Sequence, residues 1–243
     1  MKAGSLMERL QRLRQAVRRF WKKTHMNQII ILAGAVFLLA FLGFFWYFAA
    51  TANVESLKKG LAQSTVIYDK DGDMASKISA NRTEGVSIDK MPDHLKNAIV
   101  AIEDHRFYQH NGFDVKGMSS AFFKNIVAGR ITAGGSTITQ QLTKNALLSP
   151  ERTYKRKVEE LFLAVEIEKK YTKDEILEMY LNQVFFGHSA WGVQNASRTY
   201  FGKDVEEIDL SEAATLAGIV NAPSALDPYN HMDRAIKRRN TVL

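Results

Sequence analysis

The sequence predicts a mainly α-helical domain that begins with a small β-hairpin and is preceded by a transmembrane helix. Three observations carry this prediction. Residues 29–50 contain no charged side chain. After Pro92, apolar residues recur at helical spacing and signals for further strands are few. Before Pro92, two short β-type segments, 65–69 and 74–79, flank Lys-Asp-Gly-Asp, in which Asp-Gly supplies the positive φ of a hairpin turn.

The uncharged segment from Ile29 to Ala50 predicts an uncleaved membrane anchor. Its 22 residues would form a helix of ~33 Å, against a hydrocarbon core of about 30 Å. This is too long for the apolar region of a typical signal peptide, and a buried core helix rarely lacks polar residues over so many turns. Trp46 and Tyr47 suit the interfacial belt near its end.

The positive charge is concentrated before this anchor. Residues 1–28 carry eight Lys and Arg against one Glu, a net charge of +7 that equals the formal charge of the whole chain. The positive-inside rule therefore predicts a single-pass protein of the cell membrane, with a cytoplasmic N-terminus and its folded part outside. Because that part is neutral overall, nucleic acid is not expected as a partner. The absence of cysteine excludes disulfides, thiolate metal sites and a cysteine nucleophile.

The chain is thus expected to divide into a basic tail (1–28), a transmembrane helix (29–50), a juxtamembrane linker (51–63) and one folded domain (64–243). The helical pattern continues to Leu243, and the sequence leaves open whether a further domain follows this residue. The first helix is expected to begin after Asp93 as its N-cap, and the second to cover 115–128. A third should run from a cap at Ser136 or Thr137 to Leu147, and a fourth should cover 153–170. A Thr172–Glu175 capping box should open the next, and further helices are expected over 190–200, 211–220 and 233–243.

The densest group of chemically competent side chains lies at 102–114, where a helix runs out into a turn with glycine. It holds Glu103, Asp104, His105, His110 and Asp114. Glu103 follows an apolar stripe, so partial burial would raise its pKa and suit it as a base. Composition alone favours the simpler interpretation, an acidic helix end. A zinc site is less favoured still, because the two histidines are five residues apart and face different sides of a helix.

A second and a third segment carry polar and basic groups. Residues 134–145 form a glycine turn that leads into a polar helix start, where free N–H groups and hydroxyls make an anion site plausible. The basic run of the folded part is Arg152, Lys155, Arg156 and Lys157. Beside a phosphate these cations would neutralise charge. The alternative is an ordinary i, i+4 ion pair between Arg156 and Glu160.

Taken together, these segments resemble the peptidoglycan glycosyltransferase family, the glycan-polymerising domain of class A penicillin-binding proteins and of monofunctional transglycosylases. Five motifs match in order over roughly 65–243. They are Glu103-Asp104-x-x-Phe107-x-x-His110-x-Gly112-x-Asp114, then Gly135-Ser136-Thr137-Ile138-Thr139-Gln140-Gln141-Leu142-x-Lys144-Asn145, Arg156-Lys157-x-x-Glu160, Ile176-Leu177-Glu178-x-Tyr180-Leu181-Asn182, and Glu212-Ala213-Ala214 through Ala222-Pro223-Ser224.

The resemblance implies a lysozyme-like fold with a smaller lobe next to the membrane. It implies polymerisation of lipid II with release of undecaprenyl pyrophosphate, and as partners lipid II, the growing glycan strand, the bilayer and the cell-wall synthesis machinery. Glu103 matches the general base, and Glu160 the second essential carboxylate. The groups that match binding or bracing positions are Lys144, Arg152, Arg156, Lys157, Ser136, Thr137, Gln141, Asp104, Phe107 and His110.

No cofactor is required by the resemblance, although Mg²⁺ or Mn²⁺ assists some members without a dedicated metal site. Two other functions remain open from the sequence: a lysozyme-like hydrolase that cuts glycan, and a non-catalytic scaffold for cell-wall synthesis. The apolar segment 122–127, with Phe122 and Phe123, is expected to contact the headgroup zone of the membrane.

Overall fold

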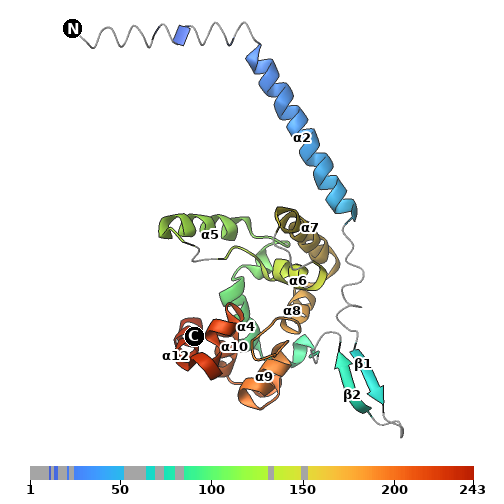
Figure 1. Cartoon of the computed structure of the whole chain (residues 1–243), viewed down its shortest axis with the longest axis vertical. Helices are drawn as coiled ribbons and strands as arrows, with labels where there is room; N and C mark the ends of the chain where they lie inside the picture. The colour runs from blue at the N-terminus through green and yellow to red at the C-terminus, as the bar shows by residue number, and fades with distance from the viewer. Residues whose placement is uncertain are drawn as a thin grey trace, which may run out of the picture. The chain divides into compact units, whose positions relative to one another are not determined.

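The computed structural model describes residues 11, 14, 15, 21, 25–51, 64–68, 74–79, 85–130, 134–148 and 153–243. These belong to two compact units, Met1–Thr51 and Ala52–Leu243. Figure 1 shows the chain with its helices and strands labelled. Residues 52–63 of the predicted linker, the hairpin turn and Arg152 lie outside the described residues, and Thr51, the first residue of that linker, is helical.

Helix α2 (Met26–Thr51) contains the predicted anchor. It begins three residues before Ile29 and ends one residue after Ala50. Within the part of the chain that the structure describes, it is the one helix long and apolar enough to cross a membrane. Its large apolar side chains, such as Phe37, Leu39 and Trp46, are exposed. The described residues of its own unit do not cover them, and the length and apolar composition of the helix are those of a membrane span.

Strands β1 (Ser64–Tyr68) and β2 (Met74–Ser79) form a two-stranded antiparallel sheet. Their positions agree with the two β-type segments of the sequence to within one residue. Because the residues between the strands lie outside the described part, the hairpin itself stays a prediction.

The second unit is otherwise helical, as the apolar spacing predicts. Its helices are α4 (Asp93–Glu103), α5 (Val115–Ala128), α6 (Ile138–Leu147), α7 (Tyr154–Lys170), α8 (Lys173–Leu181), α9 (Val193–Phe201), α10 (Leu210–Val220), α11 (Pro223–Leu226) and α12 (Pro228–Val242). Single 3-10 turns cover 88–90, 107–109 and 205–207.

Helix starts are set by side-chain caps. Capping boxes open α6 and α8, where Thr137 and Thr172 accept a hydrogen bond from the backbone of the third helical residue. Thr137 rather than Ser136 is therefore the cap of α6.

Expectations at three helix starts were wrong. Helix α9 begins at Val193 and not at 190, after Gly192 as N-cap with φ +78°, and α12 begins at Pro228 and not at 233, because the side chain of Asp227 caps it. Helix α4 begins at Asp93, and Pro92 is its N-cap. Asp93 adds a negative charge to the first turn instead, where it is favoured by the helix dipole.

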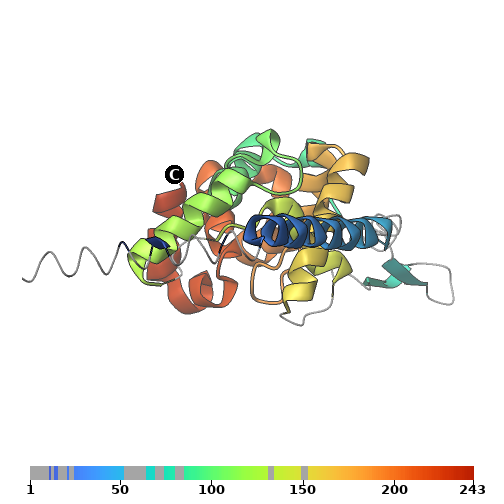
Figure 2. The same ribbon diagram turned by 90° about the horizontal axis from the view of Figure 1, so that it is seen from above.

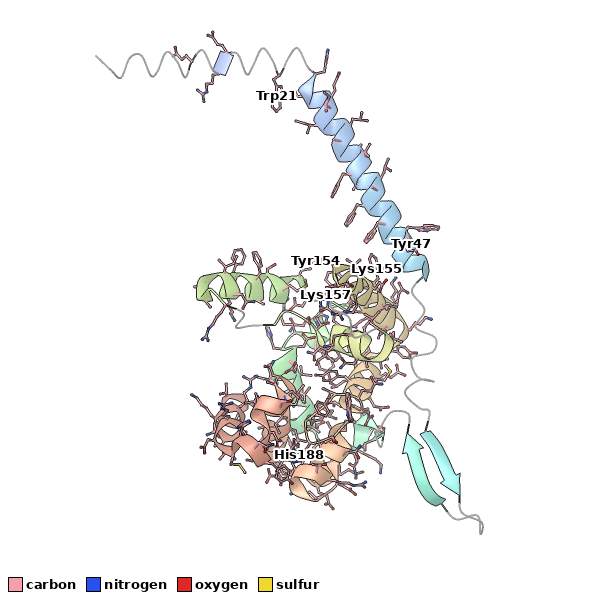
Figure 3. All side chains as sticks on the ribbon, in the orientation of Figure 1. Trp21, Tyr47, Tyr154, Lys155, Lys157 and His188 are labelled. Atoms are coloured by element: carbon pink, nitrogen blue, oxygen red, sulfur yellow. The ribbon has the colours of Figure 1, made fainter. Side chains whose placement is uncertain are left out.

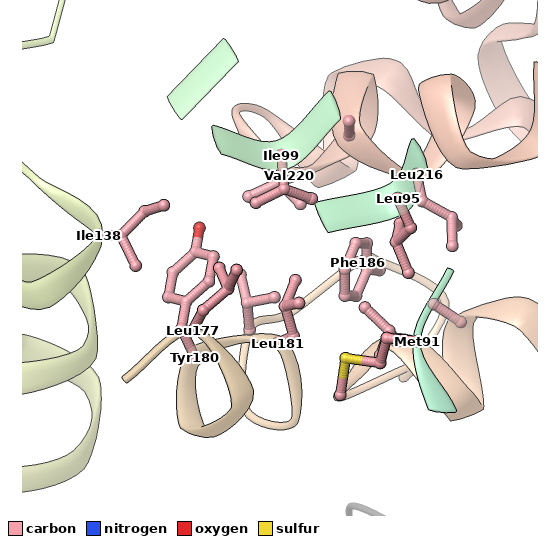
Figure 4. Packing of buried hydrophobic residues seen from close by; sticks show 14 of the residues in the cluster. Met91, Leu95, Ile99, Ile138, Leu177, Tyr180, Leu181, Phe186, Leu216 and Val220 are labelled. Carbon is pink, nitrogen blue, oxygen red and sulfur yellow. The ribbon is translucent and has the colours of Figure 1, made fainter. Parts of the chain in front are cut away.

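The core is one cluster of buried side chains from α4, α6, α8 and α10, in which α10 packs against α4 and α8 packs against α6, and Figure 4 shows part of it. Leu95 and Ile99 on α4 are one turn apart and fully buried, as are Leu177 and Tyr180 on α8. The ring of Tyr180 lies near Ile138 in this view, with its hydroxyl directed away from α8. This packing fixes the end of α4 and the start of α6 with respect to each other.

Helix α10 lies between α4 and α12 and packs against both, while α6 packs against α7 and α8. Helix α5 differs from these, because Ala121 is its one buried residue. In Figure 1 it lies apart from α10 and α12, and Figure 2, seen from above, shows it passing over the C-terminal helices. One face of α5 is consequently left for solvent or lipid, and the other faces the site described next.

Candidate active site

Glu103 is the last residue of α4, whose apolar face holds it against the core. Its Oε2 accepts a hydrogen bond from Nε2 of Gln141 on α6, over 2.9 Å. Its Oε1 is buried and accepts no hydrogen bond. Burial is the largest influence on this carboxyl and raises its pKa above the ordinary value. A carboxylate with one uncommitted oxygen and a raised pKa is suited to accept a proton.

Gln141 is held in turn by Tyr180. The Tyr180 hydroxyl donates to Oε1 of Gln141 over 3.2 Å, which leaves the amide nitrogen of Gln141 to donate to Glu103. Tyr180 is almost fully buried, and burial, with the charges of Glu103 and Asp104, raises its pKa well above the ordinary value. The hydroxyl therefore stays protonated, and the order of donors from Tyr180 to Gln141 to Glu103 is fixed.

Asp104 joins the end of α4 to the start of α6. Its Oδ2 accepts from Nε2 of His110 over 2.9 Å and from the backbone N–H of Ile138 over 3.1 Å. Both side chains of the Asp104–His110 pair are almost fully buried. Asp104 thus satisfies one of the free N–H groups at the start of α6 and, through His110, ties the loop after Glu103 to that helix.

The loop 105–114 is pinned against α7 and α6. Gly112 has φ +91°, and a Cβ there would meet the backbone of Ala164 and Val165 at 2.9 Å. The Thr137 hydroxyl donates to the carbonyl of Gly112 over 2.6 Å. Only glycine combines this backbone conformation with such a close approach to another helix.

Phe107 lies inside this loop and is fully buried. The ammonium of Lys173 lies 4.4 Å from the centre of its ring, within the range of a cation–π contact. Phe107 therefore supports the loop from behind and does not reach the cleft.

The second carboxylate lies in a basic cluster on α7. Glu160 is almost fully buried, and its Oε1 accepts from Lys157 while its Oε2 lies 3.4 Å from Nη1 of Arg156. The ammonium of Lys157 also donates to Oγ of Ser136 over 3.0 Å. Figure 3 shows Lys157 on α7, at the opposite end of the domain from His188. Lys157 thereby links the α7 cluster to the loop before α6.

A cleft of about 170 Å³ brings the first carboxylate and this loop together. Of the residues proposed from the sequence, Glu103, Asp104, Ser136 and Thr137 line it. Its opposite wall comes from α5, through Gly117, Ser120, Ala121 and Lys124, and His105 also lines it. The α5 residues were missed by the sequence reasoning, although their spacing of three, four and seven residues is the signal of one helix face.

Other proposed residues lie elsewhere. Lys144 is exposed in the last turn of α6, one turn beyond Gln141, and does not line this cleft. Arg152 lies outside the described residues. Two neighbours of Glu103, Asn221 and Arg238, act on its carboxyl, and no local pattern pointed to either.

Three carboxylates at or near the site are engaged by protein groups. Asp104 holds His110 and the start of α6, Glu160 holds Lys157 and Arg156, and Asp114 is paired with Arg106. Over the described ranges, no group of three or more His, Asp and Glu side chains is close enough to hold a metal ion. These residues do not fit a resident cation.

Comparisons with known proteins agree on one family. The family model described as Transglycosylase matches residues 71–243. Penicillin-binding protein 2a of Streptococcus pneumoniae is 40% identical over 93% of this chain and 30% of its own length. Penicillin-binding protein 1F of Bacillus subtilis is 42% identical over 91% of this chain and 31% of its own length.

Penicillin-binding protein 1A of Escherichia coli is 46% identical over 73% of this chain and 21% of its own length. The crystal structure of penicillin-binding protein 1A from Haemophilus influenzae is 27% identical, covers 74% of this chain and 17% of that one, and has a TM-score of 0.38. The chain thus spans at most about a third of the length of the curated relatives named here.

Proposed function

The chain belongs to the transglycosylase family, and on that premise we propose that it is a membrane-anchored peptidoglycan glycosyltransferase that polymerises lipid II into β-1,4-linked glycan. The observation that carries the proposal is that Glu103 and Ser136 line the same cleft. Oε1 of Glu103 has no hydrogen-bond partner, and the Ser136 hydroxyl accepts a hydrogen bond from Lys157. Joining a sugar hydroxyl to a sugar diphosphate requires a base and cations for the leaving group. Glu103 lines the cleft, and Lys157 contacts its lining through Ser136.

In this proposal Glu103 accepts the proton of the GlcNAc 4-hydroxyl of the incoming lipid II. The oxygen attacks C1 of the terminal MurNAc of the growing strand, the bond from C1 to the diphosphate oxygen breaks, and undecaprenyl pyrophosphate leaves with both electrons of that bond. The anomeric centre inverts to β. Lys157 and Arg156 are proposed to neutralise the leaving group, and Lys144 and Arg152 to extend that set of cations.

Glu160 has a different proposed role, because its carboxylate is buried between two cations. It holds Lys157 and Arg156 in place and does not compete for the sugar hydroxyl. Asp104, His110, Phe107 and Gln141 are proposed as supports of the base and its loop, while Thr137 ties the start of α6 to that loop.

The anchor suits this substrate. A protein held in the bilayer by α2 and a lipid-linked substrate are confined to the same surface, which raises their effective concentration. We infer that the basic residues before α2 stay in the cytoplasm and that the domain acts outside, next to the membrane. The exposed apolar side chains of α5, among them Phe122 and Phe123, are proposed to contact the headgroup zone.

The test is polymerisation of lipid II by the detergent-solubilised full chain and by Glu103→Gln. General-base catalysis contributes about 10²–10⁴-fold, so Glu103→Gln should lose nearly all polymer formation while its circular dichroism is retained. Glu206→Gln, an exposed carboxylate paired with Lys90 at 3.1 Å, is the matched control and should stay active. Shortening of added glycan without polymer would favour a hydrolase, and binding of lipid II without turnover would favour a scaffold.

A further inference from the structure

Lys124 on α5 is an ammonium group of the cleft that no step of the proposed reaction uses. It lines the cleft together with Glu103, Ser136 and Thr137. Within the described part of the chain, it is the one lysine among the lining residues, and none of them is an arginine. The cleft wall opposite the base therefore carries a positive charge of its own.

The position of this lysine follows from a close contact between α5 and the loop before α6. A Cβ at Gly135 would lie 3.1 Å from Cα of Met118 and 3.6 Å from Cβ of Ala121, so the loop rests directly on α5. Lys124 comes three residues after Ala121 and therefore lies one turn further along the same helix face. It is thus beside the loop that carries Ser136.

The charge of Lys124 is uncommitted, unlike that of the cations on α7. Lys157 and Arg156 both pair with the buried carboxylate of Glu160. Lys124 has no carboxylate or other hydrogen-bond partner among the residues that the structure describes. A cation without a protein partner can act on an anionic ligand with its full charge, whereas a paired cation is already partly neutralised.

We propose that Lys124 is a further substrate-binding residue, whose ammonium binds the diphosphate of the lipid-linked substrate from the α5 side of the cleft. Phosphate oxygens are strong acceptors for a lysine ammonium. Lys157 reaches the same cleft lining through Ser136, so two lysines from different helices would act on one anion. This inference rests on the proposed function, because that function supplies the diphosphate.

The two faces of α5 favour the diphosphate over the other anions of the substrate, the carboxylates of its peptide. Phe122 and Ile126, two residues before and after Lys124, lie on the opposite side of the helix and are exposed. If that side meets lipid, a group bound at Lys124 is about one helix diameter, ~10 Å, from the lipid surface. The diphosphate is attached directly to the lipid chain, whereas the peptide is attached to the sugar.

Binding of farnesyl diphosphate, a short analogue of the leaving group, tests this assignment. Isothermal titration calorimetry on the detergent-solubilised full chain should show binding about tenfold weaker in Lys124→Met, because a charge-assisted contact is lost. Lys124→Arg keeps the charge and should bind nearly as wild type does. Farnesol has the same chain without the diphosphate, and wild type and Lys124→Met should bind it equally.

Lys116→Met is the matched control for charge on the same helix. Lys116 is exposed in the first turn of α5 and does not line the cleft. This variant should bind farnesyl diphosphate as wild type does. A loss of affinity equal to that of Lys124→Met would show a general effect of positive charge on α5 and would overturn the inference.

Polymerisation distinguishes the diphosphate from the peptide. Lys124→Met should lower kcat/KM for lipid II, and by the same factor for lipid II whose peptide carboxylates are amidated. If amidation removed the difference between variant and wild type, Lys124 would bind the peptide and the inference would be wrong.

The two proposals can fail separately. If wild type makes polymer and Lys124→Met binds farnesyl diphosphate as tightly as wild type, the Lys124 inference is wrong and the proposed function stands. If wild type makes no polymer and Lys124→Met alone binds farnesyl diphosphate more weakly, the function is wrong and the diphosphate contact of Lys124 stands.

Discussion

Gln141 donates a hydrogen bond from Nε2 to Oε2 of Glu103 over 2.9 Å, and the two residues come from different helices, 38 positions apart in the chain. The contact satisfies one oxygen of a buried carboxylate and leaves the other uncommitted. Tyr180 donates to the oxygen of the same amide, and turning the amide over would place that oxygen against the Glu103 carboxylate and lose the bond to it. The geometry of the proposed base is therefore set by α6 and α8 as much as by α4.

Replacing Gln141 by Met should move the acid limb of the pH profile of kcat/KM to higher pH. The hydrogen bond from Gln141 lowers the pKa of Glu103, and its removal leaves burial less opposed. Steady-state polymerisation of lipid II over a range of pH measures the shift. Tyr180→Phe, which keeps the ring and removes the hydroxyl that orients Gln141, should shift the limb in the same direction by less. An unchanged profile in both variants would contradict the role of this contact.

Replacing Lys157 by Met should weaken both folding and polymerisation. Glu160 would keep Arg156 as its one cation, at 3.4 Å, and a buried acceptor that loses a partner costs about 1–3 kcal/mol. Urea unfolding measures this loss. Adding Glu160→Gln to Lys157→Met should recover part of the stability but not the activity, because the cation is still missing.

A matched control for Lys157 lies two residues earlier. Lys155 is largely exposed and pairs with Glu159 over 3.8 Å, and an exposed pair of this kind is worth about 0–1 kcal/mol. Lys155→Met should therefore change stability little. If it were as destabilising as Lys157→Met, the buried Glu160 would not be the cause.

Gly112→Ala should be markedly destabilising and should disturb the loop after Glu103. The positive φ alone costs about 1–2 kcal/mol for a residue with a Cβ, and the approach of 2.9 Å to the backbone of Ala164 adds overpacking. Gly129→Ala is the control, since Gly129 has φ +63° with open space around it. Equal losses of unfolding free energy in the two variants would show that the contact with α7 has no importance.

Replacing Phe122 and Phe123 together by Ser should lower the association of the anchor-free unit, residues 52–243, with liposomes of anionic phospholipid. Both rings are about two-thirds exposed on α5, at 62% and 65%, and their transfer to the membrane interface would bury apolar surface. Co-sedimentation measures the bound fraction. A double Ser variant of Leu210 and Met232, which are also exposed, should bind as wild type does. Equal binding of all three proteins would remove α5 from the membrane-contact proposal.

The sequence by itself determined the elements with a local physical cause. An uncharged apolar run predicted α2, apolar spacing predicted most of the helices, and the Thr172–Glu175 capping box opens α8 where the pattern placed it. The motif around Glu103 could also be recognised from the sequence. These features depend on residues within a few positions of one another, so the chain alone carries them.

The tertiary structure decided which side chains share a site. It placed Gln141, Asn221 and Arg238 around Glu103, turned the α5 face of Ser120 and Lys124 toward the cleft, and left Lys144 outside it. Such neighbours depend on the angles and distances at which helices pack, and these follow from the fit of many distant side chains rather than from local spacing. The burial that raises the pKa of Glu103 has the same origin, because it exists only once the helices around α4 have closed over its end.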